Sequence, residues 1–193
     1  MTMHIRTALV SLVAAAGPAG ADMLDTDALP VWETCALCHG LDGRSAVGRF
    51  PHLAGLGPAY IEKQLRDFRN GLRRNDGGQM ATVAAALDDA GIVAAAGYFG
   101  RLPPSPARPD VPAADPDGRA CDGCHAGGEA TAPSLAGQQR DYLAKQLREF
   151  RSGARANDVD GVMRAVTRRL NDETIERLAD HYAGAAGPRS RNP

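Results

Sequence analysis

The chain contains one sequence pattern twice. Residues 51–76, PHLAGLGPAYIEKQLRDFRNGLRRND, align without gaps on residues 133–158, PSLAGQQRDYLAKQLREFRSGARAND, with 15 of 26 positions identical. Each copy follows two cysteines separated by two residues, with a histidine directly after the second. These residues are Cys35, Cys38 and His39 in the first half and Cys121, Cys124 and His125 in the second. Such a duplication predicts two structural units with the same fold. Any function assigned to them must account for the Cys-x-x-Cys-His group in each unit.

The boundary between the two units lies in a proline-rich stretch. Residues 102–118, LPPSPARPDVPAADPDG, cannot form a regular helix because prolines lack the amide hydrogen and clash with the preceding turn. We therefore predict a first domain over residues 22–102, a linker over residues 103–115 and a second domain over residues 116–193. A proline-rich linker of this length is extended, so it lets the second domain fold back on the first, and we expect a compact pair.

The N-terminus, MTMHIRTALVSLVAAAGPAGAD, has the parts of a secretory signal peptide. Arg6 precedes an apolar run, and the small residues Ala19 and Ala21 are spaced for cleavage before Asp22. A membrane anchor is the alternative, but the apolar run is much shorter than the roughly 20 residues of a spanning helix. We predict a signal peptide over residues 1–21, export to the periplasm and no transmembrane span after cleavage, with peripheral membrane association left open.

Charge and composition limit the classes of partner and cofactor that the chain can have. The chain has 22 basic and 23 acidic residues, and a nucleic-acid-binding surface needs clustered, excess Lys and Arg, so no nucleic acid partner is expected. Only 5% of the residues are aromatic, and a domain of about 80 to 90 residues buries a small core in any case. We therefore expect a bulky apolar cofactor or a covalent staple in each domain.

Periodicity and capping residues predict helices in both halves. A short helix is expected to begin near Pro30 or Pro116, because proline fits a first turn, and to run into the Cys-x-x-Cys-His group. An amphipathic helix follows and ends near Gly71 or Gly153. Its apolar stripe comprises Ile61, Leu65 and Phe68 in the first half and Leu143, Leu147 and Phe150 in the second.

The last helix of each half is expected to begin after Asp88 or Asn171, which are favourable N-cap residues. A loop that carries Met80 or Met163 is predicted to connect it to the amphipathic helix. No window alternates between apolar and polar residues in the manner of a strand. The sequence therefore predicts an all-α protein with two small domains.

Three chemistries use two cysteines separated by two residues. A structural zinc site needs four ligands, whereas each half supplies three. A redox dithiol of the thioredoxin type belongs to a βαβ pattern, which this sequence lacks. Covalent haem attachment uses every member, because both thiols bond to the porphyrin and the histidine ligates the iron. We therefore predict two covalently bound haem c groups, one on each Cys-x-x-Cys-His group, with His39 and His125 as iron ligands.

The remaining iron position decides what a haem does. An open position allows gas binding or peroxide turnover, whereas a filled one leaves electron exchange. After residue 21 the chain has three methionines, and two of them, Met80 and Met163, lie 41 and 38 residues after the histidine of their half. A single methionine more often fills a gap in a core, but the matched positions favour iron ligation. His52 and His181 are predicted to be surface or packing residues.

Further motifs are shared by the two halves. They are FPxLAG at Phe50–Gly55 with a shorter copy at Pro133–Gly137, YxxKQL at Tyr60–Leu65 and Tyr142–Leu147, and the FRxGxRxND that follows each. With the signal peptide, the two Cys-x-x-Cys-His groups and the late methionines, they make the sequence similar to the dihaem cytochrome c4 family over nearly all of the mature chain. The resemblance implies two tandem class I cytochrome c domains, joined by the proline-rich linker, with their haems close together.

The function that the resemblance implies is that of a periplasmic cytochrome, not an enzyme, that carries single electrons between respiratory donors and a terminal oxidase or reductase. Its partners would be redox proteins, a membrane oxidase or a dehydrogenase among them. An alternative is a dihaem electron-accepting subunit of a periplasmic dehydrogenase, of the flavocytochrome sulfide dehydrogenase type. A haem enzyme, such as a peroxidase or a thiosulfate-oxidising enzyme, would need a vacant or unusual sixth ligand.

The resemblance also implies that the carbonyl groups of Pro51 and Pro133 accept the Nδ1 protons of the two ligand histidines. Tyr60 and Tyr142 have two interpretations: they hydrogen-bond a haem propionate, or they merely start the amphipathic helix. A solvated helix face is predicted for the basic residues that follow. These are Lys63, Arg66 and Arg69 with their copies Lys145, Arg148 and Arg151.

One departure from the family concerns the first helix, which is short, most of all in the second half, where Gly118 lies three residues before Cys121. This leaves open whether the first and last helices cross there. In the first half, Trp32 can pack on Tyr98 or Phe99.

Overall fold

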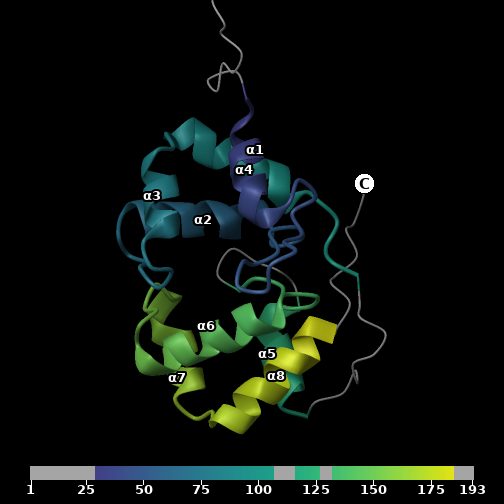
Figure 1. Cartoon of the computed structure of the whole chain (residues 1–193). Coiled ribbons are helices and arrows are strands. Elements are labelled where there is room, and N and C mark those ends of the chain that lie inside the picture. The colour runs from purple at the N-terminus through teal and green to yellow at the C-terminus, as the bar shows by residue number, and fades with distance from the viewer. Residues whose placement is uncertain (1–28, 107–115, 127–131, 185–193) are drawn as a thin grey trace, which may run out of the picture.

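The computed structural model describes residues 29–106, 116–126 and 132–184, and no strand occurs among them. Figure 1 shows two groups of helices, the first half above the second. The first group consists of α1 (Val31–His39), α2 (Pro58–Arg69), α3 (Gln79–Ala85) and α4 (Asp89–Gly100), and the second of α5 (Pro116–His125), α6 (Arg140–Ser152), the 3-10 helix η2 (Val159–Gly161), α7 (Val162–Thr167) and α8 (Asp172–Gly184). The predicted all-α fold with two domains is confirmed. The predicted signal peptide and residues 107–115 of the predicted linker lie outside the described residues, and the domain boundaries stay predictions.

The first helix of each half runs into the Cys-x-x-Cys-His group, as predicted. Pro30 occupies the N-cap position of α1, and Pro116 is the first residue of α5. Both helices end at the histidine. After His39 the chain turns at Gly40, whose φ of 77° lies in the left-handed region that glycine adopts without strain.

The amphipathic helices α2 and α6 form the centre of each domain. Their apolar stripes pack against the last helices, α2 on α4 and α6 on α8. Asp88 begins α4 as an N-cap, since its carboxylate accepts the Gly91 N–H at 2.7 Å. Asn171 caps α8 in the same way through the Thr174 N–H at 2.8 Å. The predicted helix starts are therefore confirmed.

The methionines lie in helices, which corrects the predicted loops. Met80 is the second residue of α3, and Met163 is the second residue of α7. Both helices are short, of seven and six residues, so hydrophobic periodicity over such a span is too weak to separate them from a loop.

The first and last helices pack together in both halves by different side chains. In the first half the ring of Trp32 stacks on Tyr98 with centroids 4.8 Å apart, as predicted. In the second half the Tyr182 hydroxyl donates to the Gly118 carbonyl at 2.8 Å, and a Cβ at Gly118 would lie 2.7 Å from His181 Nε2. The absent side chain at Gly118 therefore lets α5 approach α8, and the crossing that the sequence left open is formed.

The two domains contact each other, which confirms the predicted compact pair. Gln138 of the second domain bonds both backbone groups of His52, accepting its N–H at 2.7 Å and donating to its carbonyl at 2.9 Å. Gln139 donates to the Ser45 carbonyl at 2.7 Å.

Among the described residues, no single helix is long and apolar enough to cross a membrane. The helices α3 and α4 reach the required length and hydropathy only together, and the chain bends by 119° between them.

The contact between α2 and α4 yields a stability prediction. A Cβ at Gly100 would lie 2.5 Å from the backbone nitrogen of Pro58, so Gly100→Ala forces the two helices apart. We expect a loss of about 1–3 kcal/mol in the free energy of unfolding, measured by denaturant titration followed by circular dichroism. Gly97→Ala is the control on the same helix, because its Cβ meets nothing closer than 3.7 Å. An equal effect of both substitutions would contradict the packing argument.

Candidate haem sites

The two histidines of the repeated groups are buried and held in the same way. His39 is 7% exposed and His125 is 9% exposed. The Nδ1 of His39 lies 2.9 Å from the Pro51 carbonyl oxygen, and that of His125 lies 2.8 Å from the Pro133 carbonyl oxygen. A carbonyl only accepts, so Nδ1 is the donor and Nε2 keeps its lone pair. The predicted contacts are confirmed, and they hold both rings with Nε2 available to bind a metal.

The surroundings of these rings favour their neutral form. Burial lowers the pKa of His39 and of His125, and the hydrogen bond to the backbone carbonyl raises it by a smaller amount. A neutral imidazole is the form that binds a metal.

The four cysteines are free of disulfide bonds. Within each group the two thiols are three residues apart on one helix and therefore share a face. The first of each pair, Cys35 and Cys121, is half-buried at the edge of its domain's apolar core, whereas the second is exposed. Burial raises the pKa of the Cys35 thiol. A half-buried thiol at the edge of an apolar core, a second thiol on the same face of the helix and a neutral histidine fit a covalently attached haem.

Two aspartates that the sequence analysis did not single out fix the methionine helices. Asp76 accepts the backbone N–H of Met80. Asp158 accepts the backbone N–H of Arg164 at 3.0 Å and its guanidinium Nε at 2.8 Å. Both aspartates end the repeated Asn-Asp pair, a few residues before the methionine. That recurrence was the available signal, since aspartate before a short segment is typical of a helix N-terminus.

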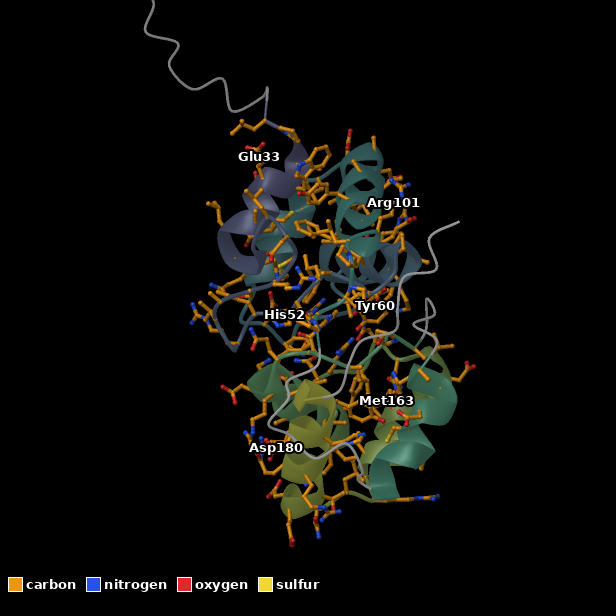
Figure 2. The ribbon with its side chains drawn as sticks, turned by 90° about the vertical axis from the view of Figure 1, so that its right-hand side faces the viewer. Glu33, His52, Tyr60, Arg101, Met163 and Asp180 are labelled. Carbon is orange, nitrogen blue, oxygen red and sulfur yellow. The ribbon has the colours of Figure 1, made fainter. Side chains whose placement is uncertain are left out.

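Met80 packs against the same core as Cys35, and Tyr60 belongs to that core. Figure 2 shows Tyr60 and Met163 in the two halves of the molecule, with His52 near their boundary. Within the three described ranges, no group of three or more His, Cys, Asp and Glu side chains gathers as a metal-binding cluster. The four-ligand set that a structural zinc ion needs is thus not assembled in this part of the chain.

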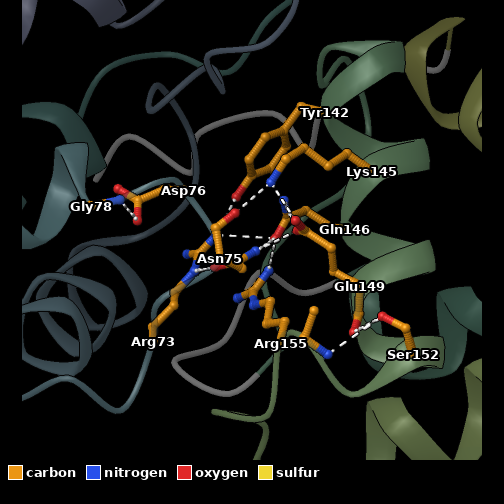
Figure 3. A network of polar contacts seen from close by, with 11 residues as sticks. Arg73, Asn75, Asp76, Gly78, Tyr142, Lys145, Gln146, Glu149, Ser152 and Arg155 are labelled. Atoms are coloured by element: carbon orange, nitrogen blue, oxygen red, sulfur yellow. Dashed lines mark hydrogen bonds and ion pairs between the residues drawn. The ribbon is translucent and has the colours of Figure 1, made fainter.

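A polar network joins the two domains, and its members come from the repeated motifs (Figure 3). The Arg73 Nη2 donates to the Tyr142 hydroxyl at 3.0 Å and to Gln146 Oε1 at 3.1 Å. The equivalent residues make the same contacts from the second domain to the first: the Arg155 Nη2 donates to the Tyr60 hydroxyl at 3.1 Å and to Gln64 Oε1 at 3.0 Å. Neither interpretation of the tyrosines foresaw these contacts, in which each hydroxyl binds an arginine of the other domain.

The repeated lysines also cross the boundary. Their side chains stay 30% exposed at Lys63 and 44% exposed at Lys145, so the predicted solvated face holds in part, and what it lacked is a contact from each ammonium group to the other domain. Lys63 donates to the Asn157 carbonyl at 2.9 Å, and Lys145 donates to the Asn75 carbonyl at 2.6 Å. The repeated arginines make their hydrogen bonds and ion pairs within their own domains. Arg69 and Arg151 donate to the Leu87 and Leu170 carbonyls, Arg66 pairs with Glu62, and Arg148 pairs with Glu176.

Electrostatics in this network favour negative charge. Burial would raise the pKa of Tyr142, but the positive charges of Arg73 and Arg155 outweigh it and lower the pKa.

The two histidines outside the repeated groups pack against their neighbours. His52, at the edge of the same interface, accepts the Ser45 N–H at 3.0 Å through Nδ1, and His181 packs edge-on against Tyr182. Both histidines are packing residues, as predicted.

Comparison with known proteins finds relatives that cover both domains, although no family model matches the chain. Cytochrome c4 of Azotobacter vinelandii is 33% identical over 214 residues, which cover 95% of this chain and 97% of the relative. The thiosulfate dehydrogenase electron acceptor of Stutzerimonas stutzeri (strain A1501) is 35% identical over 179 residues, 80% of each chain. Among solved structures, cytochrome c4 of Acidithiobacillus ferrooxidans has a TM-score of 0.68 and 29% identity, and covers 79% of this chain and 98% of its own.

The hydrogen bonds between Asp158 and Arg164 of α7 yield a second prediction. Asp158→Ala removes the acceptor of the Arg164 N–H and should destabilise the second domain by about 0.5–2 kcal/mol in denaturant unfolding near neutral pH. Burial would raise the pKa of Asp158, but the hydrogen bonds from Arg164 lower it. A carboxylate with a lowered pKa stabilises the fold above its unfolded pKa of about 3.9 and loses this effect as the pH falls through the folded pKa. The difference between the variant and the parent should therefore disappear in acid.

The exposed Asp160, two residues away, supplies the control. Asp160→Asn removes the same charge without touching Arg164 and should leave stability unchanged. If the Asp158 variant differed from the parent by the same amount at pH 3 and at pH 7, the role of its carboxylate would be refuted.

Proposed function

The chain belongs to the cytochrome c4 family, and on this premise we propose that each domain holds one haem through its own Cys-x-x-Cys-His group and its own methionine. As a family member it is a dihaem electron-transfer cytochrome, not an enzyme, and it carries two covalently attached haem c groups. Its two domains have the class I cytochrome c fold. The observation that carries the assignment is the matched pair of buried histidines, each held by a proline carbonyl.

The proposed ligand set is the same in both domains. Two cysteines would form the thioether bonds, and the histidine Nε2 and the methionine sulfur would ligate the iron. In the first domain these residues are Cys35, Cys38, His39 and Met80, and in the second they are Cys121, Cys124, His125 and Met163.

The haem iron supplies one-electron redox chemistry when it is bound. The residues of the chain orient the iron ligands and influence the reduction potential. Pro51 and Pro133 hold the imidazole rings in one orientation. A methionine thioether is a weak donor that raises the reduction potential, and by filling the sixth position it leaves no place for peroxide or carbon monoxide. Such a site exchanges electrons and performs no substrate chemistry.

We propose that the protein works in the periplasm, between respiratory donors and a terminal oxidase or reductase in the membrane. The predicted signal peptide and the family membership support this location. The partners are redox proteins in either case. Peripheral association with the membrane is part of the proposal, because an oxidase partner would hold the protein there.

A second candidate function is that of an electron acceptor for a periplasmic dehydrogenase. It is favoured by the relative from Stutzerimonas stutzeri, whose name assigns it that role toward thiosulfate dehydrogenase. The two functions separate when the purified protein is mixed with cell fractions. Rapid oxidation of the reduced protein by membranes supports the respiratory carrier, whereas reduction of the oxidised protein by periplasmic extract with thiosulfate supports the dehydrogenase acceptor.

Attachment at the four cysteines can be read by peptide mass spectrometry. After trypsin digestion of the exported protein, we expect one haem on the peptide that ends at Arg44 and one on the peptide Ala120–Arg140, because each contains a single Cys-x-x-Cys-His group. Acidic organic solvent should leave the colour on both peptides. Unmodified cysteines on either peptide would disprove attachment in that domain.

The methionine assignment predicts a selective effect of Met163→Ala. Since each domain builds its own pocket, this variant should bind carbon monoxide at one haem of two and lose the sulfur-to-iron charge-transfer band of that haem alone. Met80→Ala is the matched variant for the first domain. Stoichiometric carbon monoxide binding by the unmodified protein, or an unchanged spectrum in Met163→Ala, would rule out methionine ligation.

A further inference from the structure

The first residues of the linker lie at a junction with both domains. The Arg44 guanidinium donates through Nη2 to the Pro103 carbonyl at 2.9 Å and to the Pro104 carbonyl at 3.2 Å. Its Nη1 pairs with Asp42 at 3.2 Å, which holds the guanidinium in place. The next linker residue, Ser105, is only 8% exposed. The linker is therefore bound to the first domain and buried where it leaves that domain.

Two equivalent glycines contact this part of the linker. Gly55 and Gly137 end the Leu-Ala-Gly sequence of their half, and their φ angles of 80° and 74° lie in the left-handed region. A Cβ at Gly55 would lie 2.5 Å from Pro104 Cβ, and a Cβ at Gly137 would lie 2.9 Å from Ser105 Cβ. Because neither glycine has a side chain, the linker can pack directly on the repeated motif of both domains.

A small pocket lies between the linker and these two glycines. Its volume is about 10 Å³, which is close to the smallest space that holds one water molecule. Residues of all three segments line the pocket, among them Ser105 of the linker, His52 and Gly55 of the first domain, and Ser134 and Gly137 of the second.

Several polar side chains that line this pocket can bind a water molecule. The Ser105 hydroxyl is buried and has no hydrogen-bond partner among the described residues, although buried polar groups are nearly always paired. Ser134 is also buried, at 6% exposure. Burial, and then the positive charge of Arg44, lower the pKa of His52 and favour its neutral ring. Since the His52 Nδ1 accepts the Ser45 N–H, Nε2 carries the proton of that ring and is a donor.

We propose that this pocket is a binding site for one water molecule, which hydrogen-bonds to the Ser105 hydroxyl and to the side chains of Ser134 and His52. A buried water typically makes about three hydrogen bonds to polar groups that otherwise lack partners. The water joins the linker to both domains, so that the linker becomes a third component of the contact between them. The site does not involve the haem groups, and its test is therefore independent of the proposed function.

The direct test is a crystal structure of the purified holoprotein at a resolution that shows ordered water. We expect one water within hydrogen-bond distance of Ser105 Oγ and of a side chain from each domain. An absent water, or one that contacts the linker alone, would overturn the inference.

Ser105→Ala tests the site in solution, because the sign of its effect depends on the water. Removal of a buried hydroxyl without a partner stabilises a protein, whereas removal of a hydroxyl that binds a water costs a hydrogen bond. We therefore expect the unfolding equilibrium constant of the holoprotein to rise about three- to tenfold in a denaturant titration. A fall in this constant would show that the hydroxyl is unpaired and that the site binds no water.

The control for this variant is Ser152→Ala, at an exposed serine of α6 that donates only to the Glu149 carbonyl of its own helix. It should leave the unfolding equilibrium constant nearly unchanged. An equal rise in both variants would contradict a particular role of Ser105.

The close packing of the linker is tested by Gly55→Ala and Gly137→Ala. Gly77→Ala and Gly153→Ala are matched controls, because these glycines also have positive φ angles, of 74° and 81°, but nothing lies within 4 Å of a Cβ at either position. The first pair should raise the unfolding equilibrium constant about tenfold more than the controls, since only these variants force the linker away. Equal effects in both pairs would contradict the packing on which the pocket depends.

Discussion

The reciprocal contact of two arginines across the domain boundary determines how the rest of the molecule is arranged. Arg73 reaches Tyr142 and Gln146, and Arg155 reaches the copies of those residues in the first domain. In an interface of this kind the same patch is used on both sides. The positions that the two halves share without change include the Tyr, Lys, Gln, Arg and Asn of this network. Five of the 15 identical positions in the aligned segments are thus residues of the domain interface.

This interface gives α2 and α6 two ordered faces. Their apolar stripes pack on α4 and α8, and part of their polar faces meets the other domain. A polar face has the same sequence pattern whether water or a second polar surface covers it, which is why the contacts of Lys63 and Lys145 with the other domain were not predicted. The helices themselves could be predicted because their periods, prolines, glycines and caps are local signals. The histidine orientation was also predictable, through the resemblance that links each ligand to a proline carbonyl.

What escaped prediction depends on short elements and on absent side chains. The short helices that contain Met80 and Met163 are stabilised by aspartates rather than by a long apolar stripe. The crossing of α5 and α8 depends on Gly118, where a glycine that weakens a helix in isolation allows the backbone to meet His181 and Tyr182. Helix propensity alone rates this glycine as destabilising, whereas in the folded domain the absence of its side chain allows α5 to contact α8.

The two halves share a template but not the same surroundings, and this difference bears on the direction of electron flow. Between the cysteines the first half has Ala36 and Leu37, with Leu37 85% exposed, whereas the second half has Asp122 and Gly123. The Asp122 carboxylate, one residue from Cys121, lies 2.8 Å from the Tyr182 hydroxyl oxygen. A negative charge beside a haem favours ferric iron, because the ferrous state carries one electron more. With the haem attachment that we propose at Cys121, this charge lies beside the second haem, and the first domain is then the more favourable site for a single electron.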